Sequence, residues 1–322
     1  SLAGDYAWAV LSKTLSYAAS LVPEIAETPE EVDRAMRLGY NWKYGPFELI
    51  DRIGTSFFAA KLEASGMPVP EFLKTAMGQT FYKTEKGVLK YLSLKGKYEP
   101  IPRPEGVILL EDIKRKSEPI MKNFSSTVWD IGDGVLCLEF TSKMNSMDPL
   151  IMHTIKKLLK FIPENGYKGL VIHNEGTNFS VGANIGMLLY GSKFKLWPAI
   201  NWVLKDGQKT LQKLKYAPFP VVAAPSGMAL GGGCEVLLHC SAIEAHAETY
   251  VGLVEAGVGI VPGWGGCKEM LGRAMVNPKM PKGPMPAPMK AFETIAMASV
   301  ATSADEAKDM MFFKSTDNVV MN

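Results

Sequence analysis

The sequence predicts two regions of different structural class, a helical region followed by an α/β region. Before about residue 95, helix start and stop signals occur without strand-like alternation. After Thr127, short apolar runs alternate with helical stretches, which is the pattern of α/β architecture. Between them, residues 96–126 hold four prolines and many charges, and this composition indicates a connector. We therefore expect an all-α domain at 1–95, a linker at 96–126 and an α/β domain at 127–322.

The helical prediction for residues 1–95 starts from local signals. Thr28 suits an N-cap, Pro29 suits the first helical position, and Glu31 completes a capping box. A second helix is expected from 47 to 53, opened by the pair Gly45-Pro46. The mostly apolar segment 6–25 contains a lysine and lacks a basic start, so it predicts a buried amphipathic helix rather than a membrane span or a signal peptide.

The α/β prediction for residues 127–322 comes from apolar runs of strand length that alternate with helical patterns. Strands are expected at 135–140, 169–173 and 220–224, and helices at 149–161 and 185–216. The alternation of short apolar strands with helices indicates α/β architecture.

Composition restricts the classes of function. The formal net charge of +2, without a long Lys/Arg stripe, argues against nucleic-acid binding. The four histidines show no metal-ligand spacing, so no metal site is expected. The cysteines lie far apart in apolar surroundings without a C-x-x-C pair, which favours free, buried thiols in a reducing compartment. They are Cys137, Cys234, Cys240 and Cys267.

A glycine cluster at 226–235 is the first feature that can carry chemistry. It follows an expected strand and precedes an apolar run, and it contains Gly231, Gly232 and Gly233 in succession. Such a junction lets the backbone approach a ligand and aim N–H groups at it. A plain tight turn is the alternative, although it explains one glycine better than three. The cluster has neither the G-x-G-x-x-G nor the G-K-[ST] pattern of nucleotide sites.

Two acidic residues in apolar, glycine-rich surroundings are the second such feature. Glu235 and Glu255 lie 20 positions apart, and no Lys or Arg occurs between Lys215 and Lys268. Desolvation raises the pKa of a buried carboxyl group toward values that are useful in acid/base catalysis. The two residues are therefore candidates for an acid/base pair. The loop 178–184, taken alone, is better explained as a structural turn.

Three motifs together resemble the enoyl-CoA hydratase/isomerase (crotonase) family. They are Phe179–Ala183, Ala229–Glu235, and Glu255 followed by the run Gly259–Gly266. The resemblance covers about residues 128–320 and implies a crotonase-like fold, an α/β superhelix of repeated ββα units.

For chemistry, the resemblance implies that the backbone N–H groups of Ala183 and Gly232 form an oxyanion hole for a thioester carbonyl. Glu235 and Glu255 hold and activate water, and Glu255 has the larger proton-transfer role. Water then adds to a 2-enoyl-CoA to give a 3-hydroxyacyl-CoA, and no cofactor is needed. The residues assigned to substrate and CoA binding are Lys143, Met144, Gly182 and Gly231. Isomerisation or another reaction of the family, and a non-catalytic acyl-CoA-binding fragment, remain alternatives.

The first region carries a second resemblance. Segments 32–40 and 45–51 look like the C-terminal helical domain of 3-hydroxyacyl-CoA dehydrogenases. Because no dinucleotide fingerprint occurs in the chain, neither NAD binding nor dehydrogenase activity is expected here. The two resemblances imply a fragment of a bifunctional protein of fatty-acid β-oxidation, located in the cytoplasm.

The sequence also departs from the crotonase pattern. Asn184 stands where the family often has Asp, and the segment 193–215 is longer than in compact members and borders the acyl pocket. Because the chain ends early at Asn322, we expect the helices that complete the pocket to be missing. We expect a homo-oligomer or association with a missing dehydrogenase domain.

Overall fold

The computed structural model describes residues 1–321. They form two compact units, and the chain passes from unit 1 to unit 2 between Lys116 and Ser117. This boundary lies inside the segment 96–126 that was predicted to be a linker. The first part of that segment pairs with the sheet of unit 1, and its last part joins the large sheet of unit 2. The segment is therefore divided between the two units.

Unit 1 is mainly helical, as predicted, but the expectation of an all-α domain was wrong for residues 82–100. Its helices are α1 Leu2–Ser20, α2 Pro29–Tyr40, α3 Pro46–Ile53, α4 Thr55–Ala64, α5 Glu71–Thr75 and α6 Leu110–Lys116. An antiparallel sheet is formed by β1 Tyr82–Glu85, β2 Val88–Leu92 and β3 Tyr98–Pro100. The β1–β2 turn puts Lys86 and Gly87 at positive φ (50° and 76°), which is typical of a tight hairpin.

A buried carboxylate, Asp33, and a half-buried one, Asp51, connect the helices of unit 1 to this sheet. Asp33 on α2 accepts hydrogen bonds from the backbone N–H groups of Phe47 (2.8 Å) and Glu48 (3.0 Å) and from the hydroxyl of Tyr82 (2.9 Å). Burial raises the pKa of Asp33 to about 7, although these hydrogen bonds oppose the shift. Asp51 on α3 similarly accepts from the first N–H groups of the hairpin. Polar side chains thus fix the sheet on the helices.

The helix starts predicted near Thr28 and Pro46 are present in unit 1, whereas the segment predicted as a helix at 6–25 is helical at Leu2–Ser20. The capping box at Thr28 is present, with hydrogen bonds between Thr28 and Glu31 in both directions. Helix α1 buries only one face, which includes Leu15 and Ala19, while Tyr6 and Tyr17 are exposed. The expectation of a buried amphipathic helix therefore holds for one face of α1.

Unit 2 contains the elements predicted for the α/β region. Its strands are β4 Met121–Lys122, β5 Ser126–Asp130, β6 Val135–Phe140, β7 Gly169–His173, β8 Asn178–Ser180, β9 Val221–Ala224, β10 Met228–Leu230, β11 Ala242–His246, β12 Tyr250–Gly252, β13 Val300–Ala301 and β14 Asn318–Val320. Its α-helices are α7 Pro149–Glu164, α8 Ile185–Lys193, α9 Trp197–Lys215, α10 Gly232–Leu238, α11 Gly266–Val276, α12 Pro286–Ala296 and α13 Ala304–Asp309, and two short 3-10 helices are η1 Lys143–Asn145 and η2 Glu255–Val258.

These strands form two sheets that the chain visits in alternation. The larger sheet has the order β14-β11-β9-β7-β6-β5-β4, and the smaller has the order β13-β12-β10-β8. The chain runs from β7 to β8, from β9 to β10 and from β11 to β12, so each turn puts one strand in each sheet before a helical segment follows. This repetition confirms the ββα superhelix.

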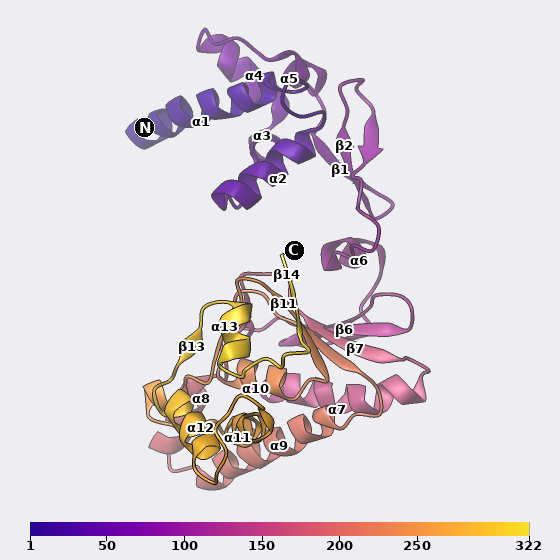
Figure 1. The fold of residues 1–322 in the computed structure, drawn as a ribbon. Coiled ribbons are helices and arrows are strands. Elements are labelled where there is room, and N and C mark those ends of the chain that lie inside the picture. The colour runs from indigo at the N-terminus through magenta and orange to yellow at the C-terminus, as the bar shows by residue number, and fades with distance from the viewer. Residues whose placement is uncertain (322) are drawn as a thin grey trace. The chain divides into compact units, whose positions relative to one another are not determined.

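Helices cover the large sheet of unit 2 on the side where its core lies. In Figure 1, α7, α9, α10 and α11 lie below the strands β6, β7 and β11. The core joins residues of the sheet, such as Leu138 and Ile172, to residues of the helices, such as Ile155 and Leu211. The single helix predicted at 185–216 is interrupted, because Lys195 between α8 and α9 has a positive φ of 55°.

None of the helices in the described part of the chain has the length and apolar character that a membrane crossing requires. Among the cysteines, Cys137, Cys234 and Cys240 are buried as predicted. Cys267 is exposed, so the expectation that all four are buried was wrong for this residue. Cys267 is the second residue of α11, where only part of the helix faces the core.

Candidate active site

The two predicted acids follow neighbouring strands of the small sheet. Strands β10 and β12 are parallel, with Leu230 opposite Gly252, and the N–H of Gly231 donates to the carbonyl of Gly252 at 2.8 Å. Glu235 lies in the first turn of α10, just after β10, and Glu255 begins η2, just after β12. The parallel pairing therefore brings together two residues that are 20 positions apart in the sequence.

Gly231 makes the turn between β10 and α10. Its φ of 51° and ψ of −121° lie in a region that residues with a Cβ avoid. A Cβ at this position would lie 3.3 Å from Oε1 of Glu255. The turn thus brings the backbone up to the second carboxylate, and a side chain at this position would occupy that space.

Glu235 is almost fully enclosed, with 2% of its surface exposed. Its Oε1 accepts two hydrogen bonds of 2.8 Å, from the backbone N–H groups of Trp264 and Gly266. Burial raises the pKa of Glu235 to about 7; the N–H of Gly266 opposes this shift and the charge of Glu255 adds to it. A carboxyl group with this pKa can both give and take a proton near neutral pH.

Glu255 is half-buried, and its Oε2 has no hydrogen-bond partner within residues 1–321. Burial raises the pKa of Glu255 as well. An unpartnered buried carboxylate oxygen is costly for folding, so its presence calls for a functional explanation. Oε2 of Glu255 is free to accept a proton or a hydrogen bond from a molecule in the site.

The two predicted backbone donors lie beside the acids. At Gly182, with φ of 96°, a Cβ would lie 2.9 Å from the carbonyl oxygen of Leu230 and 3.3 Å from the nitrogen of Gly232. A Cβ on Gly232 would lie 3.4 Å from the nitrogen of Ala183. Neither the N–H of Ala183 nor that of Gly232 is used in a hydrogen bond of the described fold. Two neighbouring, unused N–H donors are the elements of an oxyanion hole.

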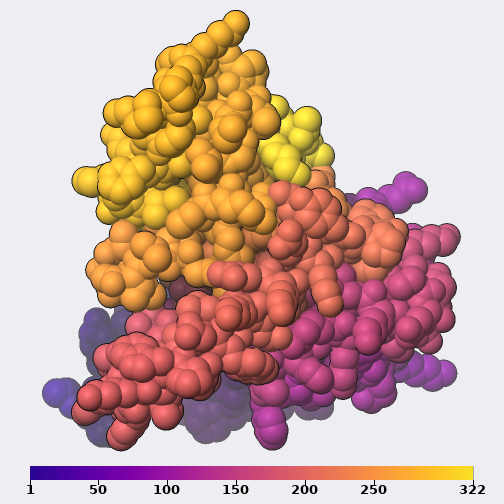
Figure 2. Space-filling model, turned by 90° about the horizontal axis from the view of Figure 1, so that it is seen from below, coloured from indigo at the N-terminus to yellow at the C-terminus, as the bar shows by residue number. Residues whose placement is uncertain are grey.

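A cavity of about 780 Å³ connects all four of these groups. At one end it is lined by Ala183, Gly232, Glu235 and Glu255. The wall that leads away from them is apolar and comes mainly from α8, α9 and the segment after η2. It includes Met187, Leu188, Phe194, Trp197, Ile200, Val203, Leu204, Ile260, Val261 and Trp264. Figure 2 views the side of unit 2 where the salmon surface of α8 and α9 meets the orange surface of the segment that follows Glu255.

Trp264 links the apolar wall to the polar end of the cavity. A Cβ on Gly207 of α9 would lie 2.3 Å from Nε1 of Trp264, and one on Gly232 would lie 2.9 Å from its Cζ3. The indole therefore packs between two glycines, one on each side of the site. The sequence motif contained Trp264, but neither its packing nor its backbone donation to Glu235 was predicted.

Of the four residues assigned to substrate and CoA binding, two lie at the site and two lie outside the cavity. Gly182 and Gly231 shape the backbone of the site, as described above. Lys143 and Met144 lie on η1 and do not line the cavity, whereas Met147, which follows that helix, does. Met144 has a positive φ of 54° and is 53% exposed. Their contact with a CoA chain stays a prediction.

Two family models match parts of this chain. Residues 130–280 match the family described as enoyl-CoA hydratase/isomerase, and residues 6–98 match the family described as 3-hydroxyacyl-CoA dehydrogenase, C-terminal domain. The crystal structure of an enoyl-CoA hydratase from Thermoplasma volcanium GSS1 superposes with a TM-score of 0.52 at 19% sequence identity and covers 62% of this chain and 73% of that chain. At this identity the likeness shows the fold alone.

Two relatives extend the comparison. A Bacillus subtilis (strain 168) protein named "Probable 3-hydroxyacyl-CoA dehydrogenase" is 42% identical over 323 residues, which are 99% of this chain and 40% of the relative. The fatty acid oxidation complex subunit alpha of Vibrio vulnificus (strain CMCP6) is 33% identical over 132 residues, 40% of this chain and 18% of the relative. The chain thus spans less than half the length of either relative. Its segment 130–280 belongs to the enoyl-CoA hydratase/isomerase (crotonase) family, and it follows a 3-hydroxyacyl-CoA dehydrogenase C-terminal domain.

Proposed function

We propose that unit 2 hydrates a 2-enoyl-CoA to a 3-hydroxyacyl-CoA, as a step of fatty-acid β-oxidation. One observation carries the proposal: two carboxylates with raised pKa and two unused backbone N–H donors line the same end of one cavity. A fatty acid oxidation complex subunit among the relatives supports the metabolic setting.

The first step of the proposed reaction polarises the substrate. The thioester carbonyl accepts hydrogen bonds from the N–H groups of Ala183 and Gly232, which makes C3 electrophilic and stabilises negative charge on the oxygen. Losing one such donor typically costs about 10²–10³ in kcat. The acyl chain extends along the apolar wall of the cavity, where its burial contributes to binding.

The second step adds water. A water molecule bound between Glu235 and Glu255 attacks C3, and Oε2 of Glu255 takes its proton as the C–O bond forms. The electrons of the double bond move to the enolate oxygen in the oxyanion hole. When the enolate collapses, C2 takes the proton from Glu255, so one water supplies both the hydroxyl and the hydrogen. Glu235, fixed by two backbone donors, holds the water in position.

Isomerisation of a 3-enoyl-CoA is the second candidate reaction, because it needs the oxyanion hole and a single proton shuttle. Glu255 offers that shuttle, since its Oε2 is free whereas Oε1 of Glu235 is bound by two N–H groups. The presence of both acids at the cavity favours hydration. The third candidate is an acyl-CoA-binding fragment without turnover.

One experiment separates the three candidates. The intact chain is incubated with crotonyl-CoA in water labelled with heavy oxygen, and separately with a 3-enoyl-CoA, without added NAD⁺ or metal. Hydration predicts heavy oxygen at C3 of a 3-hydroxyacyl product. An isomerase would convert the 3-enoyl substrate without taking up the label. Binding without any product would support the non-catalytic candidate and contradict the other two.

The CoA portion of the substrate is proposed to lie along the backbone of Lys143 and Met144, as the family resemblance implies. The same proposal requires no cofactor besides the thioester substrate. We expect no NAD⁺-dependent oxidation of a 3-hydroxyacyl-CoA by this chain, because its sequence has no dinucleotide fingerprint.

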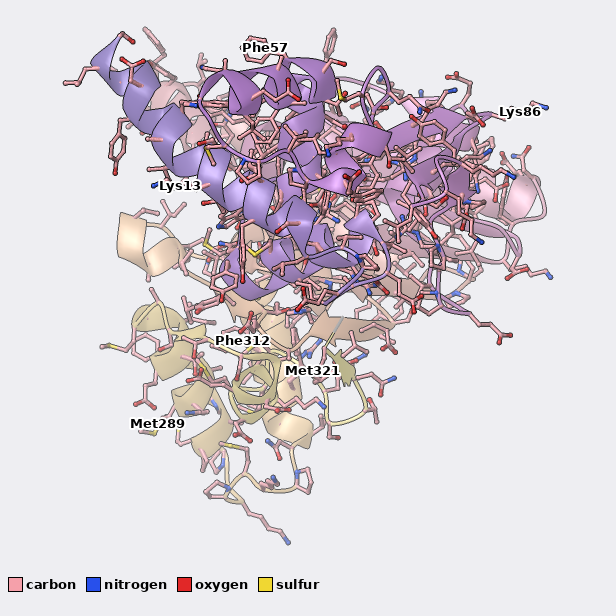
Figure 3. The ribbon with its side chains drawn as sticks, turned by 90° about the horizontal axis from the view of Figure 1, so that it is seen from above. Lys13, Phe57, Lys86, Met289, Phe312 and Met321 are labelled. Carbon is pink, nitrogen blue, oxygen red and sulfur yellow. The ribbon has the colours of Figure 1, made fainter. Side chains whose placement is uncertain are left out.

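We further propose that the protein acts in the cytoplasm and forms a homo-oligomer or associates with a dehydrogenase domain. The buried thiols of Cys234 and Cys240 fit a reducing compartment. Exposed apolar side chains outside the cavity, on α8 and α12, support an association. Leu189 is 64% and Met289 is 61% exposed, and Figure 3 labels Met289. Light scattering of the purified chain measures its mass in solution and tests the homo-oligomer.

A further inference from the structure

A buried histidine lies behind Glu235, and the proposed reaction does not use it. His239 follows α10, and only 1% of its surface is exposed. Its Nδ1 lies 2.7 Å from the backbone carbonyl oxygen of Glu235. Because a carbonyl oxygen only accepts hydrogen bonds, Nδ1 carries the proton and donates it to this oxygen. The ring is thus attached to the same turn of helix that carries the Glu235 side chain.

The opposite edge of the ring contacts the turn that holds the Glu235 carboxylate. Gly265 has φ of 119°, and a Cβ at this position would lie 3.0 Å from both Cε1 and Nε2 of His239. Gly265 stands between Trp264 and Gly266, whose N–H groups donate to Oε1 of Glu235. The imidazole therefore fills the space between the backbone of Glu235 and the two donors that fix its carboxylate.

The turn is also fixed from its far side by a cluster of charges. The N–H of Glu269 donates to the carbonyl of Gly265 at 2.9 Å. The carboxylate of Glu269 binds the ammonium groups of Lys215 (2.6 Å) and Lys268 (2.8 Å) and lies 3.6 Å from Nε2 of His239. The pKa of Glu269 is lowered, because its hydrogen bonds to the two lysines outweigh the opposite effect of burial. Glu269 is therefore an anion that joins α9 to the start of α11.

From these contacts we propose that His239 is a positioning residue, whose ring keeps the turn 264–266 aligned so that its two N–H groups bind the Glu235 carboxylate. The importance of this role for catalysis rests on the proposed function of Glu235. The geometric part does not, because it concerns only the hydrogen bonds of Glu235 in the free protein.

The geometric part predicts a measurable change in Glu235 when the ring is removed. Backbone N–H donors stabilise the ionised carboxylate and so lower its pKa. In His239→Leu the turn loses its support and the donors separate from Oε1, so the titration midpoint of Glu235 rises by about one pH unit. In His239→Asn the side-chain amide occupies the place of Nδ1 and donates to the same carbonyl, so the midpoint returns toward that of the parent.

The experiment is a titration of the intact chain with ¹³C-labelled glutamate, followed by NMR, with the Glu235 signal assigned through Glu235→Gln. His153→Leu, on the exposed face of α7, is the matched control and should leave the midpoint unchanged. Gly265→Ala is a second disturbing variant, in case His239→Leu does not fold, because its Cβ pushes against the ring. An unchanged Glu235 midpoint in whichever of these two variants folds overturns the positioning role.

The same variants are assayed with crotonyl-CoA at pH 7. Positioning predicts that His239→Leu lowers kcat by about tenfold with KM changed less than twofold, and that His239→Asn recovers most of kcat. Equal loss in the leucine and asparagine variants contradicts it. If the parent has no hydratase activity, the proposed function fails, while the NMR titration still decides whether His239 positions Glu235.

Discussion

Oε1 of Glu235 accepts a hydrogen bond of 2.8 Å from the backbone N–H of Trp264, which lies 29 residues further along the chain. The donor comes from the turn that begins α11, whereas Glu235 belongs to α10. A second bond of the same length comes from Gly266. Two rigid backbone groups therefore set the direction of this carboxylate, and water in the site meets an acid that is already oriented.

The first prediction concerns pH and Glu235→Gln. The pKa of Glu235 in the folded protein, about 7, lies above its ordinary value of 4.5, so the folded state binds this proton more tightly than the unfolded state does. The parent therefore loses stability as pH rises from 4.5 to 7, whereas the amide of the variant does not titrate. The free energy of unfolding of Glu235→Gln, relative to that of the parent, should therefore increase by up to about 3 kcal/mol between pH 4.5 and pH 8.

Denaturant unfolding of parent and variant across this pH range measures the difference. The amide oxygen of glutamine still accepts from Trp264 and Gly266, so the comparison isolates the charge. A free-energy difference that stays constant with pH would show that Glu235 titrates at its ordinary value.

The second prediction concerns Gly231→Ala. An alanine at φ of 51° and ψ of −121° is strained by about 1–3 kcal/mol, and its Cβ would press on Oε1 of Glu255. We expect lower stability together with a loss of hydratase activity. Gly257→Ala is the control, because its Cβ finds only Ala298, at 3.7 Å. Melting temperature and crotonyl-CoA turnover are measured for both, and equal behaviour of the two variants would refute the account of this turn.

The third prediction concerns the contact between Gly207 and Trp264. A Cβ placed 2.3 Å from Nε1 of Trp264 must displace the indole or α9, and such overpacking typically costs about 1–3 kcal/mol. Gly207→Ala should therefore destabilise unit 2 and shift tryptophan fluorescence. Gly272→Ala on α11, where no atom lies within 4 Å of the added Cβ, should gain up to about 1 kcal/mol from helix propensity. A stabilised Gly207→Ala variant would be inconsistent with the close packing described.

The fourth prediction concerns the buried carboxylate of unit 1. Asp33→Ala leaves the N–H groups of Phe47 and Glu48 and the hydroxyl of Tyr82 without their acceptor. Each buried group left unsatisfied costs about 1–3 kcal/mol. Calorimetry should show the melting of unit 1 at a clearly lower temperature. The exposed Asp5→Ala variant should melt as the parent does, and a similar melting point for Asp33→Ala would mean that Asp33 does not hold the hairpin.

Sequence reasoning found the acids of the site but not the groups that orient them. Glu235 and Glu255 are visible because an acid in an apolar, glycine-rich run is unusual. The N–H donors of Trp264 and Gly266 belong to the backbone, so no side-chain signal marks them. The role of His239 has no sequence signal either, because its contact with Gly265 depends on how α10 and α11 pack.

The fold was predictable to a similar degree. Apolar runs located β6, β7 and β9, since buried parallel strands have a strong signal. The β1–β2 hairpin was not predicted, because its turn needs a positive φ at Lys86 and a lysine is not a residue type that signals this conformation. The break between α8 and α9 was missed for the same reason, at Lys195. Long periodic segments could thus be predicted from the sequence, whereas turns that depend on a single residue with an unusual backbone conformation could not.

The fifth prediction concerns water addition by Glu235 and Glu255. The rate of crotonyl-CoA hydration is measured in four proteins: the parent, Glu255→Gln, Glu235→Gln and the control Glu164→Gln on the exposed end of α7. Removing a general acid/base group typically costs about 10²–10⁴ in rate. If the two carboxylates activate water, the parent is active, both site variants lose activity by a factor of that size with Glu255→Gln the more severe, and the control is unchanged. A folded parent without activity, or a Glu255→Gln variant as fast as the parent, would contradict it.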